Sequence, residues 1–147
     1  MKVFISSTYE DLKEYRQAAI EIVNRYKDIP IAMEFFGAQP AEPTKVCEEE
    51  IKECDVFIGI YAHRYGYVPE GQRKSITRQE YELAKEEGKD CLCFIVDGKY
   101  AWPPDYIEMG KYPKLKAFLK IVKKDNVVEF FKSPEDFSGK FSVSLGI

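Results

Sequence analysis

Short apolar runs alternate with longer amphipathic segments along the whole chain. The runs lie at residues 2–6, 31–36, 56–61, 91–96 and 127–131, and each has the length of a strand. Residues 56–61 are apolar almost throughout, which is typical of a central parallel strand covered on both faces. Strands that alternate with helices require right-handed crossovers, so the pattern predicts a three-layer α/β fold with a doubly wound parallel sheet. For five strands we expect the flavodoxin-like order 2-1-3-4-5.

Local capping signals predict where the helices begin. Ser7 opens an S-x-x-E capping box, and Thr44 and Thr77 stand where the second and third helices are expected to start. Pro113 predicts the start of the fourth helix, and Ser133 followed by a proline predicts the start of the last. The end of this last helix stays open, because the final apolar positions alternate as in a strand: Phe141, Val143, Leu145 and Ile147.

Composition indicates one globular domain over residues 1–147. The chain is 45% hydrophobic, which suffices for a single core. Its 22 basic and 25 acidic side chains leave a net charge of −3, so we expect neither nucleic acid nor membrane as a general partner. No segment approaches the roughly 20 apolar residues of a membrane span. The apolar end at residues 145–147 suggests a domain excised from a longer multidomain protein.

Cysteine spacing predicts a cytoplasmic protein. The four cysteines form neither a zinc knuckle nor a C-x-x-C pair, so free thiols in a reducing cytosol are expected at Cys47, Cys54, Cys91 and Cys93. His63 is the only histidine, and we therefore expect no metal site. A glycine-rich nucleotide fingerprint is also missing, which argues against dinucleotide oxidoreduction and P-loop phosphoryl transfer and against a bound cofactor.

Polar residues are expected to meet at the carboxyl ends of the first and third strands. Ligands of such sheets bind beyond the strand ends at the switch point, which lies between these two strands. Hydroxyl groups, backbone N–H groups at a helix start and a carboxylate would converge there, a combination that suits a sugar or a phosphate. The candidates for binding a nucleotide or its ribose are Ser6, Ser7, Thr8, Tyr61, Arg64, Ser75 and Thr77.

Glu80 is the candidate catalytic residue, and two interpretations of it are open. A carboxylate near the anomeric carbon can stabilise or attack the oxocarbenium ion that forms when an N-glycosidic bond breaks. Alternatively, Thr77-x-x-Glu80 is itself a capping box, in which the glutamate only returns a hydrogen bond to the helix start. Ser7 likewise either caps a helix or holds a ligand, and both can hold at once.

Two further positions have alternative interpretations. Glu34, near the end of the second strand, is expected to touch a ribose, to pair with Arg64 or to face solvent. Trp102 lies in the longest irregular stretch, together with Tyr100, Tyr106 and Tyr112. These aromatic residues suit a partner surface, although covering an edge of the core explains them equally well.

Several motifs, in order and at matching spacing, resemble the "domain of unknown function 4062" family over nearly the whole chain. They include residues 3–12, 32–36, 55–61, 63–66 and 75–77, completed by Glu80-Tyr81 and Ala84. The resemblance implies a fold like that of TIR domains. It also implies an N-terminal module of larger proteins that carry a NACHT-type or related signalling ATPase and repeats. The ATPase part of such a parent protein, or another copy of the domain, would be the partner.

A wider resemblance concerns the chemistry. Thr77-x-x-Glu80-x-x-x-Ala84 is similar to the segment that carries the catalytic glutamate in nucleoside deoxyribosyltransferases and nucleotide N-glycosidases. Active TIR domains place their glutamate on the corresponding helix and cleave NAD, but the tryptophan-cysteine pair that precedes it there is replaced here by residues 77–79. The resemblance implies a signalling or effector module that cleaves NAD or another nucleotide with Glu80. A non-catalytic interaction and self-assembly domain is the alternative.

Overall fold

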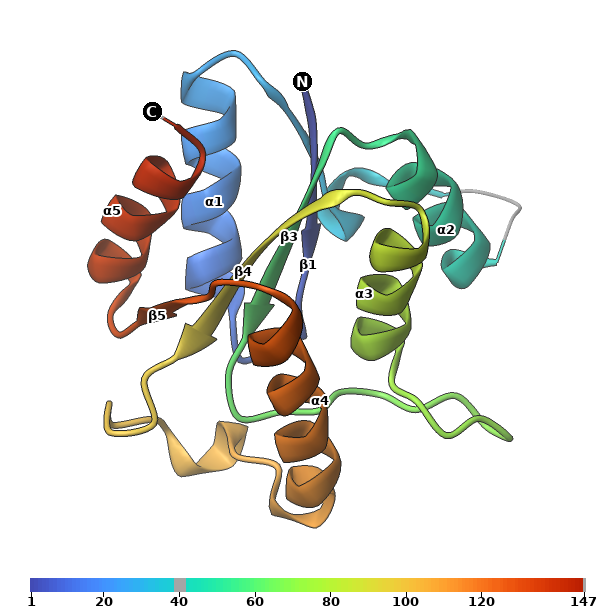
Figure 1. Ribbon diagram of the computed structural model, residues 1–147, viewed down its shortest axis with the longest axis vertical. Coiled ribbons are helices and arrows are strands. Elements are labelled where there is room, and N and C mark those ends of the chain that lie inside the picture. The colour runs from blue at the N-terminus through green and yellow to red at the C-terminus, as the bar shows by residue number, and fades with distance from the viewer. Residues whose placement is uncertain (39–41, 147) are drawn as a thin grey trace.

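A five-stranded, all-parallel sheet forms the centre of the described part of the chain. The computed structural model describes residues 1–38 and 42–146. The strands are β1 (Lys2–Ser6), β2 (Ile29–Ile31), β3 (Val56–Tyr61), β4 (Asp90–Val96) and β5 (Glu129–Phe131), in the order β2-β1-β3-β4-β5 (Figure 1). Each neighbouring pair is parallel. The predicted fold class and strand order are therefore confirmed.

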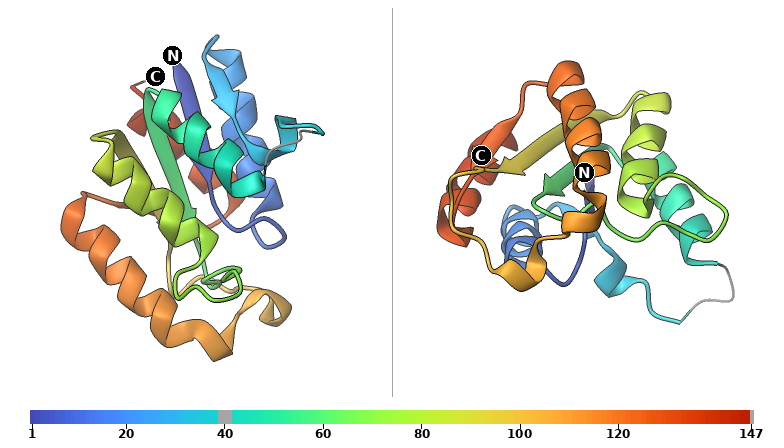
Figure 2. Two further views of the ribbon diagram at one scale, coloured as in Figure 1. Left: turned by 90° about the vertical axis from the view of Figure 1, so that its right-hand side faces the viewer. Right: turned by 90° about the horizontal axis from the view of Figure 1, so that it is seen from below.

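Helices cover both faces of the sheet. They are α1 (Lys13–Arg25), α2 (Pro43–Glu53), α3 (Ile76–Glu86), α4 (Tyr112–Asp125) and α5 (Pro134–Ser144). The first and last lie side by side on one face, whereas α2, α3 and α4 cover the other (Figures 1 and 2). Every residue of β3 is buried, because this strand is central and covered on both sides.

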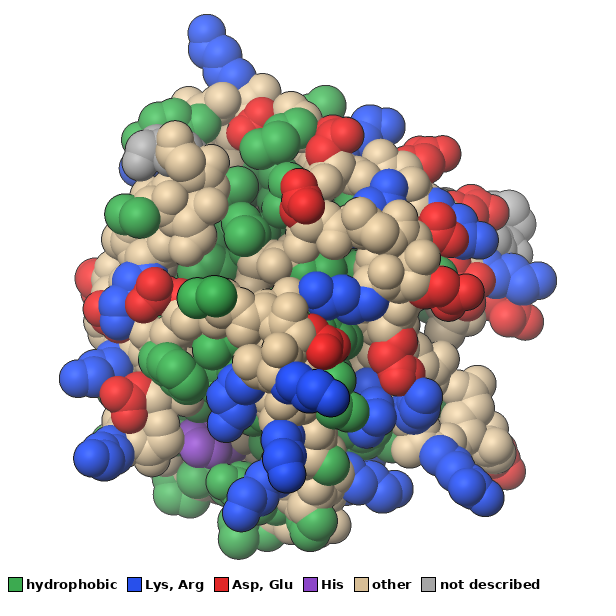
Figure 3. Space-filling model, in the orientation of Figure 1, with side chains coloured by type: hydrophobic (Ala, Val, Ile, Leu, Met, Phe, Trp, Pro, Cys, Tyr) green, Lys and Arg blue, Asp and Glu red, His purple; other side chains and the backbone are tan. Residues whose placement is uncertain are grey.

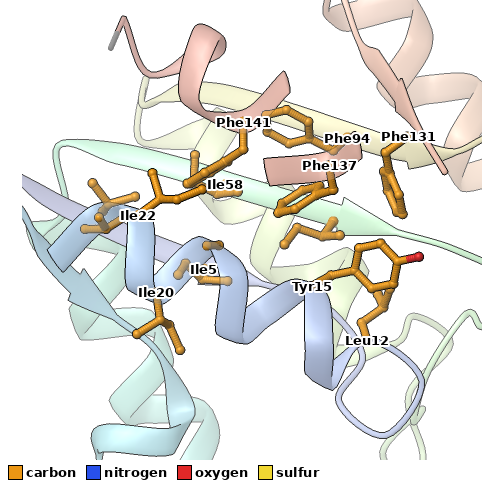
Figure 4. Packing of buried hydrophobic residues seen from close by; sticks show 14 of the residues in the cluster. Ile5, Leu12, Tyr15, Ile20, Ile22, Ile58, Phe94, Phe131, Phe137 and Phe141 are labelled. Atoms are coloured by element: carbon orange, nitrogen blue, oxygen red, sulfur yellow. The ribbon is translucent and has the colours of Figure 1, made fainter. Parts of the chain in front are cut away.

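An aromatic cluster joins α1 and α5 to the sheet. Phe137 of α5 packs edge-on against Phe94 and Phe131 of neighbouring strands, with ring centroids 5.3 and 5.4 Å away (Figure 4). Tyr15 of α1 joins the same cluster and donates its hydroxyl to the carbonyl of Lys132 at 2.6 Å. Each fully buried phenylalanine contributes about 1.5–3 kcal/mol by leaving water. This cluster thus holds α1, the helix that follows β1, against the sheet.

The second strand is shorter and earlier than the sequence pattern predicts. It pairs only at Ile29–Ile31, in register with residues 2–4 of β1, and the chain then turns into the 3-10 helix η1 (Met33–Phe35). As an edge strand it has a pairing partner on one side only. The apolar residues after it leave the sheet, and the turn brings Glu34 to α1.

Three predicted caps are wrong, because the helices begin at other residues than the sequence pattern predicts. Ser7 does not cap α1, which begins at Lys13 without a side-chain cap. Thr44 lies inside α2, which begins at Pro43, and Thr77 lies inside α3. The cap of α3 is Ser75, whose Oγ accepts from the backbone N–H of Arg78 at 3.2 Å.

The remaining helix starts agree with the sequence. Helix α4 begins next to Pro113, and α5 begins after Ser133, whose Oγ accepts from the N–H of Asp136 at 3.1 Å. The open end of α5 is helical through Ser144, and Ile147 lies outside the described residues. Two more 3-10 helices, η2 (Pro104–Tyr106) and η3 (Met109–Lys111), divide the long segment before α4.

Surface charge is unevenly distributed although the net charge is small. Lysine and arginine side chains gather over α4 in Figure 3, and that helix contains five lysines and one aspartate within Tyr112–Asp125. Within residues 1–38 and 42–146, no helix has the length and apolar character needed to cross a membrane.

Candidate active site

A cavity of about 570 Å³ opens beside the end of β1. Its walls come from β1 and the loop after it, η1, the start of α2, the loop after β3 and the start of α3. Ser7, Thr8, Arg64, Thr77 and Glu80 are among its lining residues. The structure therefore brings together five of the residues selected from the sequence, at the predicted end of the sheet.

Glu80 is tied to β1 and α2 rather than to the start of its own helix. Its Oε1 accepts from the Ser6 hydroxyl at 2.8 Å, and the Cys47 thiol also donates to the carboxylate. Burial raises the pKa of Glu80 to about 7, although both hydrogen bonds and the charge of Arg16 oppose the shift. Because Ser75 caps α3, the capping-box interpretation of Glu80 is wrong.

The Cys47 thiol stays protonated in this setting. Burial, followed by the charge of Glu80 and the hydrogen bond to it, raises the pKa of Cys47 to about 12. A neutral thiol is a weak nucleophile but a usable donor. Its contribution to the site is therefore to hold the Glu80 carboxylate.

A buried arginine, Arg16, also lines the cavity and forms an ion pair with Glu34. Arg16 donates from Nε to Glu34 Oε2 at 3.0 Å and from Nη2 to Oε1 at 2.7 Å, and its Nη1 donates to Ser7 Oγ at 2.8 Å. Burial alone would raise the pKa of Glu34, but the hydrogen bonds and charge of Arg16 outweigh it and lower that pKa. Glu34 thus pairs with Arg16 and not with Arg64, and it remains partly exposed to solvent, as one of the predicted alternatives had it.

The sequence analysis did not select Arg16, although its position in the helix indicates that its side chain is buried. It follows Leu12 by four residues and precedes Ala19 by three, so it lies on the apolar face of α1. Its side chain is only 1% exposed. An arginine on a buried helix face needs a carboxylate partner, but its identity is not readable from the helix itself.

Arg64 is held more loosely at the rim of the cavity. Its Nη1 lies 3.8 Å from Asp11 Oδ1, and its side chain is 30% exposed. Burial raises the pKa of Asp11, while the charge of Arg64 acts against this. A single long contact leaves most of the guanidinium donors of Arg64 available to an anion.

Gly66 lets the loop after β3 approach β1. Its φ is +97°, and an added Cβ would lie 3.1 Å from Thr8 Cγ2 and 3.4 Å from Thr77 Oγ1. Glu108, far along the chain, accepts from the N–H groups of Tyr65 and Gly66 at 3.0 and 3.3 Å. The long segment before α4 therefore braces this wall of the cavity.

Three of the selected residues lie outside the cavity lining. Ser6 is buried and reaches the site through Glu80, and Ser75 is buried as the cap of α3. Tyr61 packs edge-on against Phe118 in the core, with ring centroids 5.1 Å apart, because the absence of a Cβ at Gly59 leaves room for its ring. The structure does not bring Tyr61 to the cavity wall.

The aromatic segment before α4 covers an edge of the core. Trp102 is half-buried and stacks on Tyr15, with ring centroids 5.7 Å apart, and its ring also contacts His63. The four cysteines are free thiols. Within the described ranges, no group of three or more metal-ligating side chains occurs.

The fold and cavity define a doubly wound α/β protein with a buried carboxylate at its switch point. The chain belongs to the family described as "Domain of unknown function (DUF4062)", whose model matches residues 2–146. A comparison with curated protein sequences found no match.

Thirteen chains of solved structures match. One is the Clostridium botulinum CMP N-glycosidase BcmB, with a TM-score of 0.57, 19% sequence identity and 100% of both chains covered. At that identity the likeness concerns the fold.

Proposed function

We propose that this domain hydrolyses the N-glycosidic bond of a nucleotide, with Glu80 as the catalytic residue. The observation that carries the proposal is the Glu80 carboxylate, which lines a 570 Å³ cavity and is held there by Ser6 and Cys47. A carboxylate needed only for folding would pair with a cation, as Glu34 does. The fold shared with a CMP N-glycosidase supports the same reaction class.

The reaction follows from a carboxylate placed next to the anomeric carbon. The C1′–N bond breaks with its electron pair leaving on the base, and water supplies the proton that the base takes up. Ionised Glu80 stabilises the positive charge that develops on the ribose, or bonds to C1′ to give a glycosyl ester. Water then supplies hydroxide to C1′, so that one nucleotide and one water yield a free base and a ribose phosphate.

The other cavity residues suit the sugar and phosphate. Thr8 and Thr77 line the cavity and carry hydroxyl groups, and Arg64 offers guanidinium donors at the rim. The N-terminal turn of α3, with Thr77 in it, adds a favourable dipole for an anion. Arg16 is already neutralised by Glu34, so Arg64 is the better phosphate contact.

The test is base release from CMP, NAD and other common nucleotides by concentrated protein. Glu80→Gln keeps the size of the side chain and should abolish release with an unchanged or higher melting temperature. Glu82→Gln is the matched control, because Glu82 lies on the same helix but pairs with Lys74 outside the cavity. Full activity of Glu80→Gln would remove Glu80 from the mechanism.

We further propose that the domain is a TIR-like effector module of a larger NTPase-type sensor. The support is the family membership together with the resemblance in sequence to modules of such proteins. Base release that depends on the nucleotide state of a fused ATPase would agree with this role. If the unmutated protein releases no base from any nucleotide, a non-catalytic, self-assembling interaction domain becomes the better proposal.

A further inference from the structure

A second, smaller cavity adjoins the first at Glu80. It measures about 240 Å³ and lies in the groove between α2 and α3, two helices that stand side by side in Figures 1 and 2. Four residues line both cavities, namely Thr44, Cys47, Ile76 and Glu80. The catalytic carboxylate of the proposed function therefore stands between two compartments.

The two compartments differ in charge. Apolar side chains make up much of both linings, but the larger one also contains Arg64 and several hydroxyl groups, which suit a ribose and its phosphate. The groove has apolar walls from Ile51, Ile76 and Leu83, between which a planar ring can be buried. A bond cleaved at Glu80 joins a sugar to a base, so each half has a compartment that matches it.

The polar residues special to the groove present hydrogen-bond acceptors. The ionised carboxylate of Glu48 only accepts. The amide nitrogen of Gln79 already donates to Gln72 Oε1 at 2.6 Å and to the carbonyl of Lys74 at 2.8 Å, which leaves its oxygen for a ligand. The Cys47 thiol donates to Glu80. Among the described lining residues, this leaves the Thr44 hydroxyl as a side-chain donor.

We infer that the α2–α3 groove binds the base and selects bases that carry an exocyclic amino group. The inference rests on the proposed function and assigns the substrate class of that site. Cytosine and adenine offer an amino donor to Glu48 and Gln79, whereas uracil and hypoxanthine place a carbonyl oxygen at the same position and would face two acceptors. Repulsion between acceptors therefore weakens the binding of uracil and hypoxanthine.

Binding to the Glu80→Ala protein, measured by titration calorimetry, tests the inference apart from catalysis, because this variant lacks the catalytic carboxylate and adds no hydrogen-bond donor to the groove. We expect CMP to bind about tenfold more tightly than UMP, and AMP more tightly than IMP by a similar factor, from one discriminating hydrogen bond. Glu48→Gln, which adds a donor, should remove most of this preference. Glu49→Gln on the same helix, outside the groove, should leave it intact.

A blocking variant tests the location. Leu83→Trp fills the groove and should abolish the gain in affinity that the base provides, while ribose 5-phosphate still binds in the larger cavity. Equal affinity for CMP and UMP, no nucleotide binding, or a preference that Glu48→Gln leaves unchanged would overturn the inference. Selective binding of CMP by an unmutated protein that releases no cytosine would instead refute the proposed function alone.

Discussion

Two carboxylates line or approach the same cavity and are held in opposite ways. Glu34 makes two hydrogen bonds to a buried guanidinium, and its pKa is lowered. Glu80 accepts from a hydroxyl and a thiol, both neutral, and its pKa is raised to about 7. At Glu34 the charge of the nearest donor outweighs burial, whereas at Glu80, which is more deeply buried and has neutral donors, burial raises the pKa.

Removing the carboxylate partner of Arg16 should have the largest effect on stability. Glu34→Leu leaves the Arg16 guanidinium, whose side chain is only 1% exposed, without its ion-pair partner, which we expect to cost about 3–5 kcal/mol of unfolding free energy. In Arg16→Met with Glu34→Leu no charge is left uncompensated, so much of the loss should be recovered. Urea denaturation of the two variants measures both values. An equal loss in the double variant would show that packing, and not charge compensation, explains the contribution of Glu34.

The raised pKa of Glu80 predicts that the difference in stability between Glu80→Gln and the unmutated protein depends on pH. The pKa of Glu80 is raised from 4.5 to about 7, so the folded state holds a proton that the unfolded state releases between these values. The contribution of Glu80 is therefore most favourable below pH 4.5 and is lost as the pH rises through 7. Glu80→Gln has no carboxyl group at this position. Between pH 4.5 and 7 its unfolding free energy should therefore rise, relative to that of the unmutated protein, by on the order of 3 kcal/mol.

Chemical denaturation at several pH values measures that difference. Glu82→Gln serves as the control, since it removes an exposed carboxylate from the same helix. A constant difference between Glu80→Gln and the unmutated protein from pH 4.5 to 8 would mean that Glu80 is ionised throughout.

Replacing Ser6 should have a smaller effect, which concerns the pKa of Glu80. Its hydrogen bond lowers the pKa of Glu80, so Ser6→Ala should raise that pKa further. If ionised Glu80 is the active form, base release by the unmutated protein should increase with pH through about 7. In Ser6→Ala the midpoint should move to higher pH, which a rate profile from pH 5 to 9 would show. A midpoint at lower pH would contradict the donor role of Ser6.

The smallest expected effect concerns the start of the helix that carries Glu80. Ser75→Ala removes the cap of α3 and should cost about 0.5–2 kcal/mol. Thr77→Ala keeps the cap, so its effect on stability should be smaller, although it removes a hydroxyl group from the cavity. Thermal unfolding of the two variants compares them directly. A larger loss of stability in Thr77→Ala than in Ser75→Ala would indicate that Thr77 caps α3.

The predictions from sequence were most accurate where the local pattern and the tertiary environment favour the same structure. Strands β1 and β3 lie at residues 2–6 and 56–61 as predicted, because apolar runs buried on both faces have few alternatives. The caps were less predictable. Ser75 and Thr77 are both hydroxyl residues near the start of α3, so the sequence pattern does not distinguish between them, and the structure has Ser75 as the cap.

The sequence by itself determined the parallel α/β fold, the strand order and the end of the sheet where Ser7, Thr8, Arg64, Thr77 and Glu80 meet. These follow from periodicity and chain connectivity, which are properties of neighbouring residues. Only the tertiary structure decided the partners of the charged groups. Arg16 and Glu34 are 18 residues apart, and Ser6 and Glu80 are 74 apart. The ionisation of Glu34 and Glu80 is set by these contacts between distant segments, because electrostatic energy depends on distance in space and on burial rather than on sequence separation.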